Sequence, residues 1–124
     1  FTHWNSDVFK ALEALRADNR QFDLVILDPP KFASSGTHVE RALHAYRKLA
    51  RAGIPLVAPG GLLLTFSCSG AVMPEAFQKS ITLALADNHR RGRIVRRLAA
   101  ASDHVTDFGF GEGAYLKGLA LEVA

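Results

Sequence analysis

The sequence is poor in cysteine, in long apolar runs and in nucleotide-binding motifs. Its single cysteine excludes an internal disulfide, and an unpaired thiol is typical of a reducing compartment such as the cytoplasm. No apolar run reaches the roughly 18 residues that a membrane-spanning helix needs. The pattern Gly-x-x-x-x-Gly-Lys-Ser/Thr of P-loop nucleotidases is also absent. We therefore expect a globular cytoplasmic protein with no membrane partner.

Length and composition indicate one small domain. The chain has 124 residues, of which 48% are hydrophobic and 22% are charged. This size is enough to bury a core, but it is small for a complete doubly wound enzyme. The net charge of +3 permits an anionic partner without requiring one.

The spacing of apolar residues predicts alternating helices and strands. We expect helices at 6–19, from 39 to just before Pro55 and from Pro74 onward, and strands at 22–27, 62–66, 94–98 and 115–123. Ser6 suits the N-cap of the first helix, and Pro59-Gly60-Gly61 is typical of a turn. The alternation predicts an α/β fold with a mostly parallel sheet and helices on both faces.

Two of the expected strands end abruptly in polar residues. The first is followed by Asp28-Pro29-Pro30, in which the prolines remove two backbone donors and stiffen the chain. The second ends in Ser67-Cys68-Ser69, followed by a glycine that lets the chain turn away. Because an α/β sheet binds ligands at the carboxyl ends of its strands, a carboxylate and a thiol are expected at one crevice.

Each of these two side chains has a competing interpretation. A lone cysteine on an apolar strand is more often inert packing than a nucleophile, although Cys68 follows the apolar stretch rather than interrupting it. A phosphatase-type Cys-x5-Arg loop is excluded because position 74 is proline, and a metal site lacks a second cysteine. An aspartate such as Asp28 also holds Mg²⁺ in P-loop nucleotidases, but their phosphate-binding motif is absent.

Two further patterns carry less information. The segment Gly109-Phe110-Gly111-Glu112-Gly113 precedes an expected strand, whereas a dinucleotide-binding glycine loop follows a strand and opens a helix. We therefore interpret it as part of a long loop in which Glu112 is the chemically interesting residue. A basic cluster is interpreted chiefly as solvated surface, with a phosphate-backbone contact as the alternative; its members are Arg90, Arg91, Arg93, Arg96 and Arg97.

Three motifs together resemble one enzyme family. Asp28-Pro29-Pro30-Lys31-Phe32, Ser67-Cys68-Ser69-Gly70 and the segment 112–118 occur in the order and at the approximate spacing found in bacterial class I S-adenosylmethionine-dependent methyltransferases. The members in question make 5-methylcytosine in 23S ribosomal RNA. The resemblance covers nearly the whole chain and implies a Rossmann-like fold with an antiparallel last strand. It also implies S-adenosylmethionine as cofactor and ribosomal RNA as partner.

The resemblance assigns a role to each motif. Cys68 corresponds to the catalytic nucleophile, while Asp28 and Pro29 correspond to a ledge beside the methyl donor and the target base. Asp7 and Val8 fall at the position that contacts the adenine of the cofactor. The same comparison places substrate contacts at Pro30, Lys31, Phe32, Ser67 and Ser69.

The chemistry of cytosine methylation requires residues of these types. Cytosine C5 is a weak nucleophile, so a thiolate must first add to C6, which suits Cys68. An acid must support the N3 and N4 edge of the base, and a base must later remove the C5 proton. We assign the first role to Asp28 and the second to Glu112. A related enzyme class that makes 7-methylguanine keeps Asp-Pro-Pro but lacks the cysteine.

The sequence departs from the family pattern before Asp7. The first strand, the glycine-rich cofactor loop and the ribose-binding acid are not present, nor is an RNA-binding domain. Residues 1–124 are therefore expected to form the C-terminal part of a catalytic domain that is inactive by itself. The strand at 22–27 would then be an exposed edge able to pair with another copy. Two alternatives are a methyltransferase for guanine N7 or a non-RNA substrate, in which Cys68 is structural, and a non-catalytic Rossmann-like binding module.

Overall fold

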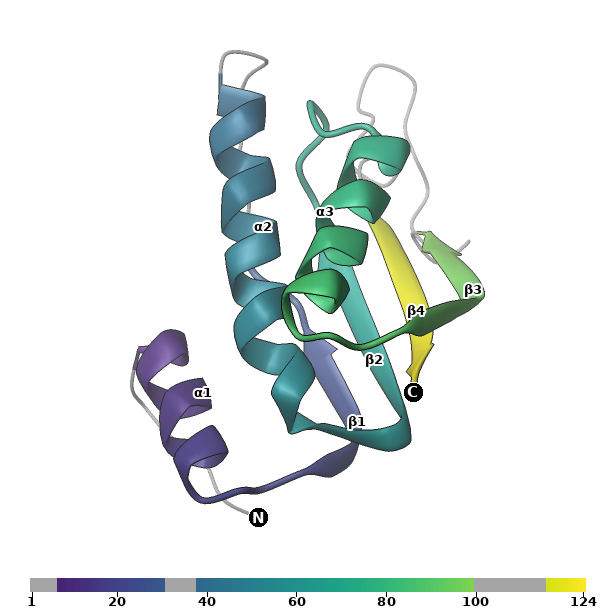
Figure 1. The fold of residues 1–124 in the computed structure, drawn as a ribbon. Helices are drawn as coiled ribbons and strands as arrows, with labels where there is room; N and C mark the ends of the chain where they lie inside the picture. The colour runs from purple at the N-terminus through teal and green to yellow at the C-terminus, as the bar shows by residue number, and fades with distance from the viewer. Residues whose placement is uncertain (1–6, 31–37, 100–115) are drawn as a thin grey trace.

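The computed structural model describes residues 7–30, 38–99 and 116–124, and it contains alternating helices and strands over these ranges. Figure 1 shows their arrangement. The helices are α1 (Val8–Ala17), α2 (Val39–Gly53), the short 3-10 turn η2 (Ile54–Leu56) and α3 (Pro74–Asp87). The strands are β1 (Phe22–Leu27), β2 (Val57–Ser67), β3 (Gly92–Ala99) and β4 (Lys117–Val123).

The four strands form one sheet in the order β1-β2-β4-β3. β1 and β2 are parallel, whereas β4 is antiparallel to both of its neighbours. β4 therefore follows β3 in the chain but lies between β2 and β3. This topology confirms the predicted α/β fold with a mostly parallel sheet and an antiparallel last strand.

The prediction of helices on both faces of the sheet is wrong for the described residues. α2 and α3 lie side by side on one face, and α1 packs beside α2 (Figure 1). The physical reason is that β1-α2-β2 and β2-α3-β3 both advance across the sheet in the same direction. Two crossovers of the same hand and direction place their helices on the same face.

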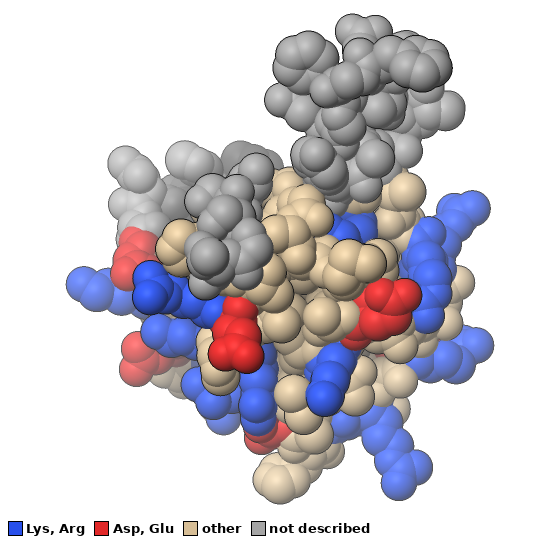
Figure 2. Space-filling view, turned by 90° about the horizontal axis from the view of Figure 1, so that it is seen from above, with Lys and Arg blue, Asp and Glu red and all other residues tan. Residues whose placement is uncertain are grey.

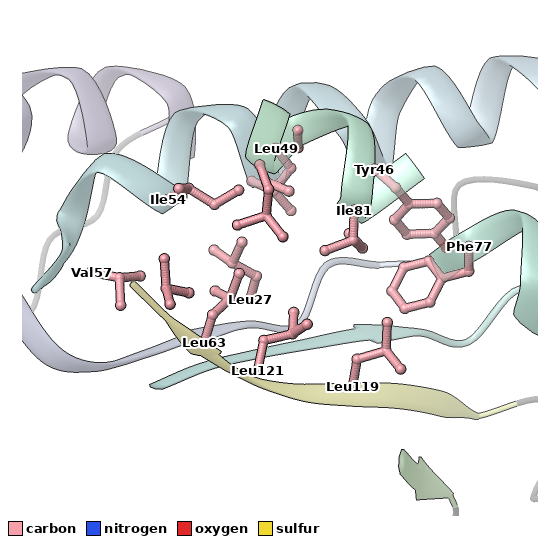
Figure 3. Close-up of a cluster of buried hydrophobic side chains, with 14 of the residues drawn as sticks. Leu27, Tyr46, Leu49, Ile54, Val57, Leu63, Phe77, Ile81, Leu119 and Leu121 are labelled. Carbon is pink, nitrogen blue, oxygen red and sulfur yellow. The ribbon is translucent and has the colours of Figure 1, made fainter. Parts of the chain in front are cut away.

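The hydrophobic core lies between the helices and the sheet. Figure 3 shows Leu49 and Ile81 from the helices facing Leu63, Leu119 and Leu121 from the strands. This packing follows from the predicted periodicity, because every fourth or third residue of α2 and α3 points toward the sheet. On the opposite face, by contrast, Leu24 and Ile26 of β1 are 50% and 55% exposed.

Two local predictions need correction. The N-cap of α1 is Asp7, whose carboxylate accepts a hydrogen bond of 2.9 Å from the Phe9 N–H, rather than Ser6. The predicted turn at 59–61 lies within β2 as an irregularity of the pairing with β1, and Gly60 adopts a φ of +83° there. The other helices and strands agree with the predicted ranges to within a few residues at their ends.

Candidate active site at the carboxyl ends of β1 and β2

Asp28 and Cys68 lie at the same edge of the sheet, on neighbouring strands. Leu27, the last residue of β1, is paired with Thr65 of β2, so that Asp28 follows one residue later and Cys68 three residues beyond Thr65. Adjacent strands are about 4.8 Å apart. Asp28 is exposed and Cys68 is half-buried. The predicted meeting of a carboxylate and a thiol at one edge is therefore consistent with the strand register.

The two serines that flank Cys68 are held from below by a tyrosine of α2. Ser67 donates a hydrogen bond of 2.9 Å to the Tyr46 hydroxyl, and the Tyr46 and Ser69 hydroxyls are 3.0 Å apart. The backbone N–H of Ser69 also donates to the Ser67 hydroxyl at 3.3 Å. Both serine side chains are fully buried. Their hydroxyls are thus used within the protein, and we assign them a structural role in place of the predicted substrate contacts.

Tyr46 reaches the serines because of its position on α2 and its packing. It belongs to the apolar stripe of that helix, and its ring makes an edge-to-face contact with Phe77 of α3 at 5.2 Å between centroids. The alternation of side chains along a strand directs Ser67 and Ser69 toward the helices and Cys68 away from them. The thiol therefore points toward the side of the sheet that the described helices leave uncovered.

Lys117 approaches the same turn from β4. It lies opposite Ser67 in the pairing of β2 with β4, and its ammonium group donates a hydrogen bond of 2.9 Å to the Ser69 carbonyl. Burial lowers the pKa of Lys117, while the negative charge of the Cys68 thiolate acts in the opposite direction and raises this pKa. Sequence reasoning did not identify Lys117 as a site residue, although the resemblance included it in its third motif.

Gly118, the residue after this lysine, has a packing role. A Cβ atom at this position would lie 2.5 Å from a carbon of the Phe66 ring, closer than such atoms approach one another. The ring of Phe66 therefore lies against bare backbone of β4, next to the turn that carries Cys68. A glycine signal within a strand indicates such a close approach.

The remaining predicted site residues are only partly described. Glu112, Lys31 and Phe32 lie outside the described residues. Pro29 is half-buried and Pro30 is exposed. Asp7 and Val8 begin α1, where the Asp7 carboxylate is exposed and Val8 is 48% exposed.

The basic cluster divides into a structural residue and surface residues. Arg90 donates hydrogen bonds to the carbonyls of Ile54 and Val57 at 2.8 and 2.6 Å, and a third to that of Ala124 at 3.0 Å. Arg93 pairs with Glu122 at 3.3 Å on the surface of the sheet. The other three arginines of the cluster are exposed. Figure 2, which views the molecule from above relative to Figure 1, shows more basic than acidic side chains on this face.

Comparisons with known proteins agree with this site. No family model matches the chain. It is 49% identical over 119 residues to "Ribosomal RNA large subunit methyltransferase I" of Alteromonas mediterranea and 44% identical over 119 residues to the protein of that name from Vibrio parahaemolyticus. Both alignments cover 96% of this chain, which spans only 30% of the length of these relatives.

A solved structure supports the fold. A crystal structure described as a methyltransferase complexed with SAH matches the chain with a TM-score of 0.75 and 23% sequence identity. The match covers 94% of this chain and 30% of the other. The fold is therefore the Rossmann-like fold seen in methyltransferases. Among the described residues, no helix is both long and apolar enough to cross a membrane.

Proposed function

We propose that this chain carries the catalytic residues of an S-adenosylmethionine-dependent methyltransferase that modifies large-subunit ribosomal RNA at cytosine C5. The observation that carries the proposal is the placement of Cys68 and Asp28 on neighbouring strand ends in a chain 49% identical to a ribosomal RNA methyltransferase. The enzyme would act in the cytoplasm, where its thiol stays reduced.

The residues at the start of α1 and at the end of β1 fit the proposed cofactor. An exposed Val8 offers apolar surface to an adenine ring, and the exposed Asp7 carboxylate can accept from its exocyclic amine. Asp28 and Pro29 would lie beside the sulfonium group. The bound cofactor supplies an electrophilic methyl group.

Cys68 would act as the nucleophile in this reaction. Its thiolate adds to C6 of cytosine, and the electron pair displaced from the C5–C6 double bond raises the electron density at C5. The new carbon–methyl bond then forms at C5 while the methyl–sulfur bond of the donor breaks. A base, which we assign to Glu112, removes the C5 proton, and the C6–sulfur bond breaks to return the thiolate.

The neighbouring residues would hold the base in place. Asp28 would hydrogen-bond the N3 and N4 edge of the cytosine and so stabilise the adduct. Pro30, Lys31 and Phe32 follow directly in the chain and would flank the target nucleotide. We keep Ser67 and Ser69 out of this set because their hydroxyls bond to Tyr46.

The decisive experiment replaces the thiol. The variants Cys68→Ala and Cys68→Ser are made in the protein joined to the polypeptide that its gene encodes upstream, and labelled methyl transfer to large-subunit ribosomal RNA is measured. We expect activity to fall at least a thousandfold, because direct attack by C5 is too slow without the adduct. Met73→Leu, an exposed position away from the strand ends, is the matched control. Activity of Cys68→Ala near the parent level would exclude covalent catalysis and favour guanine N7 or another target.

We also propose that residues 1–124 form the C-terminal part of a catalytic domain and bind S-adenosylmethionine weakly by themselves. The support is that the chain spans 30% of the length of its relatives. Isothermal titration calorimetry on the 124-residue chain should give no binding at micromolar cofactor. A micromolar dissociation constant would contradict this part of the proposal.

Self-association of the 124-residue chain is a further part of the proposal. β1 forms one edge of the described sheet, and its Leu24 and Ile26 side chains are half exposed. Parallel strands normally have both faces covered, so this apolar surface favours contact with a second copy. Sedimentation velocity should show a dimer or larger species that Ile26→Lys converts to monomer. A parent chain that is monomeric at 100 micromolar, about the upper range of such an assay, would refute it.

A further inference from the structure

The turn after β2 is fixed from two directions. From α2, the Tyr46 hydroxyl bonds to Ser67 and Ser69. From β4, Lys117 bonds to the carbonyl of Ser69 at 2.9 Å. Cys68 lies between the two serines, so the residue with the reactive thiol has little freedom to move. The two contacts differ in kind, because Tyr46 is a neutral hydroxyl and Lys117 is a cation.

The charges around Cys68 give the lysine a second task. Asp28 ends the neighbouring strand and brings a negative charge to the same edge of the sheet, which opposes ionisation of a nearby thiol. Among the described residues, the groups that contact this turn from other elements are Tyr46 and Lys117. Lys117 is thus the cation that can compensate both the carboxylate and a thiolate. The mutual effect of Cys68 and Lys117 on protonation is consistent with this arrangement.

We propose that Lys117 is a positioning residue that fixes the Cys68 turn through the Ser69 carbonyl and holds an ammonium group beside the thiolate. The inference rests on the proposed function for the role of Cys68 as nucleophile. Lys117 itself touches neither the base nor the methyl donor. It favours the ionised form of the nucleophile near neutral pH.

The reactivity of the single cysteine tests this role directly. The rate of Cys68 alkylation by iodoacetamide is measured in the 124-residue chain between pH 6 and pH 10, approximately. Lys117→Met should slow alkylation at pH 7 by about three- to tenfold, since an ion pair in partly exposed surroundings changes a thiol equilibrium by up to about tenfold. Near pH 10 the rates of parent and variant should converge, because there both the thiol and Lys117 lose their protons.

The shape of the pH profile separates this role from a structural one. If Lys117 only supported the fold, Lys117→Met would loosen the turn and change the alkylation rate by a similar factor at every pH. Lys117→Arg keeps the charge and should restore most of the rate at pH 7. Lys79→Met removes an exposed lysine of α3 and should leave the profile unchanged. Circular dichroism of each variant shows whether it is folded at each pH.

Two outcomes overturn the inference. The first is an unchanged or faster alkylation of Lys117→Met at pH 7, and the second is a uniform change across the pH range. Neither outcome depends on methyl transfer. If Cys68→Ala kept its methyltransferase activity, the proposed function would fail while the effect of Lys117 on the thiol could still be measured.

Discussion

Removing the Tyr46 hydroxyl should weaken the protein by an amount set by two buried hydrogen bonds. Tyr46→Phe keeps the ring and its edge-to-face contact with Phe77, so no cavity of the size of a side chain is created. The hydroxyl is lost from its bonds to Ser67 and Ser69, whose side chains are both fully buried. A buried polar group that loses its partner costs about 1–3 kcal/mol. We expect a loss of about 2 kcal/mol, because the serines retain contacts with each other.

Urea denaturation followed by circular dichroism measures this loss. With a slope of about 2 kcal/mol per molar urea, the midpoint of Tyr46→Phe should fall by about 1 M while the slope stays the same. Ser67→Ala in the Tyr46→Phe background should cost less than it does in the parent chain, since both partners are then apolar. The exposed Thr82→Ser of α3 serves as a control.

Two results would refute the reasoning. A loss below about 0.5 kcal/mol for Tyr46→Phe would place it among ordinary surface substitutions and show that the hydroxyl contributes little. Strict additivity of Tyr46→Phe and Ser67→Ala would show that the two groups do not interact. A changed slope, on the other hand, would indicate an altered denatured state and require a different measurement.

Two other substitutions test contacts that join the layers of the fold. Arg47 lowers the pKa of Asp87 through its hydrogen bonds, so the pair stabilises the fold above the ordinary Asp87 pKa of 3.8, and this contribution is lost as the pH falls further. Asp87→Asn should therefore lower the urea midpoint at pH 7 but not near pH 3; an equal loss at both values would contradict this. Arg90→Met deprives the buried Ile54 and Val57 of partners for their carbonyls and should cost about 2 kcal/mol in the same assay, whereas the exposed Arg91→Met should cost under about 0.5 kcal/mol. Equal losses for the two arginines would show that these bonds contribute nothing.

The parts of the fold that local sequence patterns determine could be predicted. The apolar stripe of α2 placed Tyr46 toward the core, and Pro74 marked the first residue of α3. The abrupt polar ends of β1 and β2 identified Asp28 and Cys68 as neighbours at one edge. These features depend on the residues of a single element or on the general direction of parallel strands.

Features that depend on distant residues could not be predicted. Tyr46 and Ser69 are 23 residues apart in the chain, and Lys117 and Ser69 are 48 apart. Their contacts follow from the strand order, which a linear pattern does not contain. The one-sided helix layer also depends on the direction in which successive crossovers advance. At the start of α1, Ser6 and Asp7 are equally suitable N-caps by residue type, so the sequence alone could not decide between them.

The position of β4 has a consequence for the order of events during synthesis. Residues of β1, α2, β2 and α3 leave the ribosome before β4 does, and they can form the helix layer and the parallel pair by themselves. β3, however, reaches its place in the sheet only when β4 has emerged and inserted between it and β2. Lys117 arrives with that strand, so its bond to the Ser69 carbonyl forms late. A nascent chain thus folds most of its core before the turn that carries Cys68 is complete.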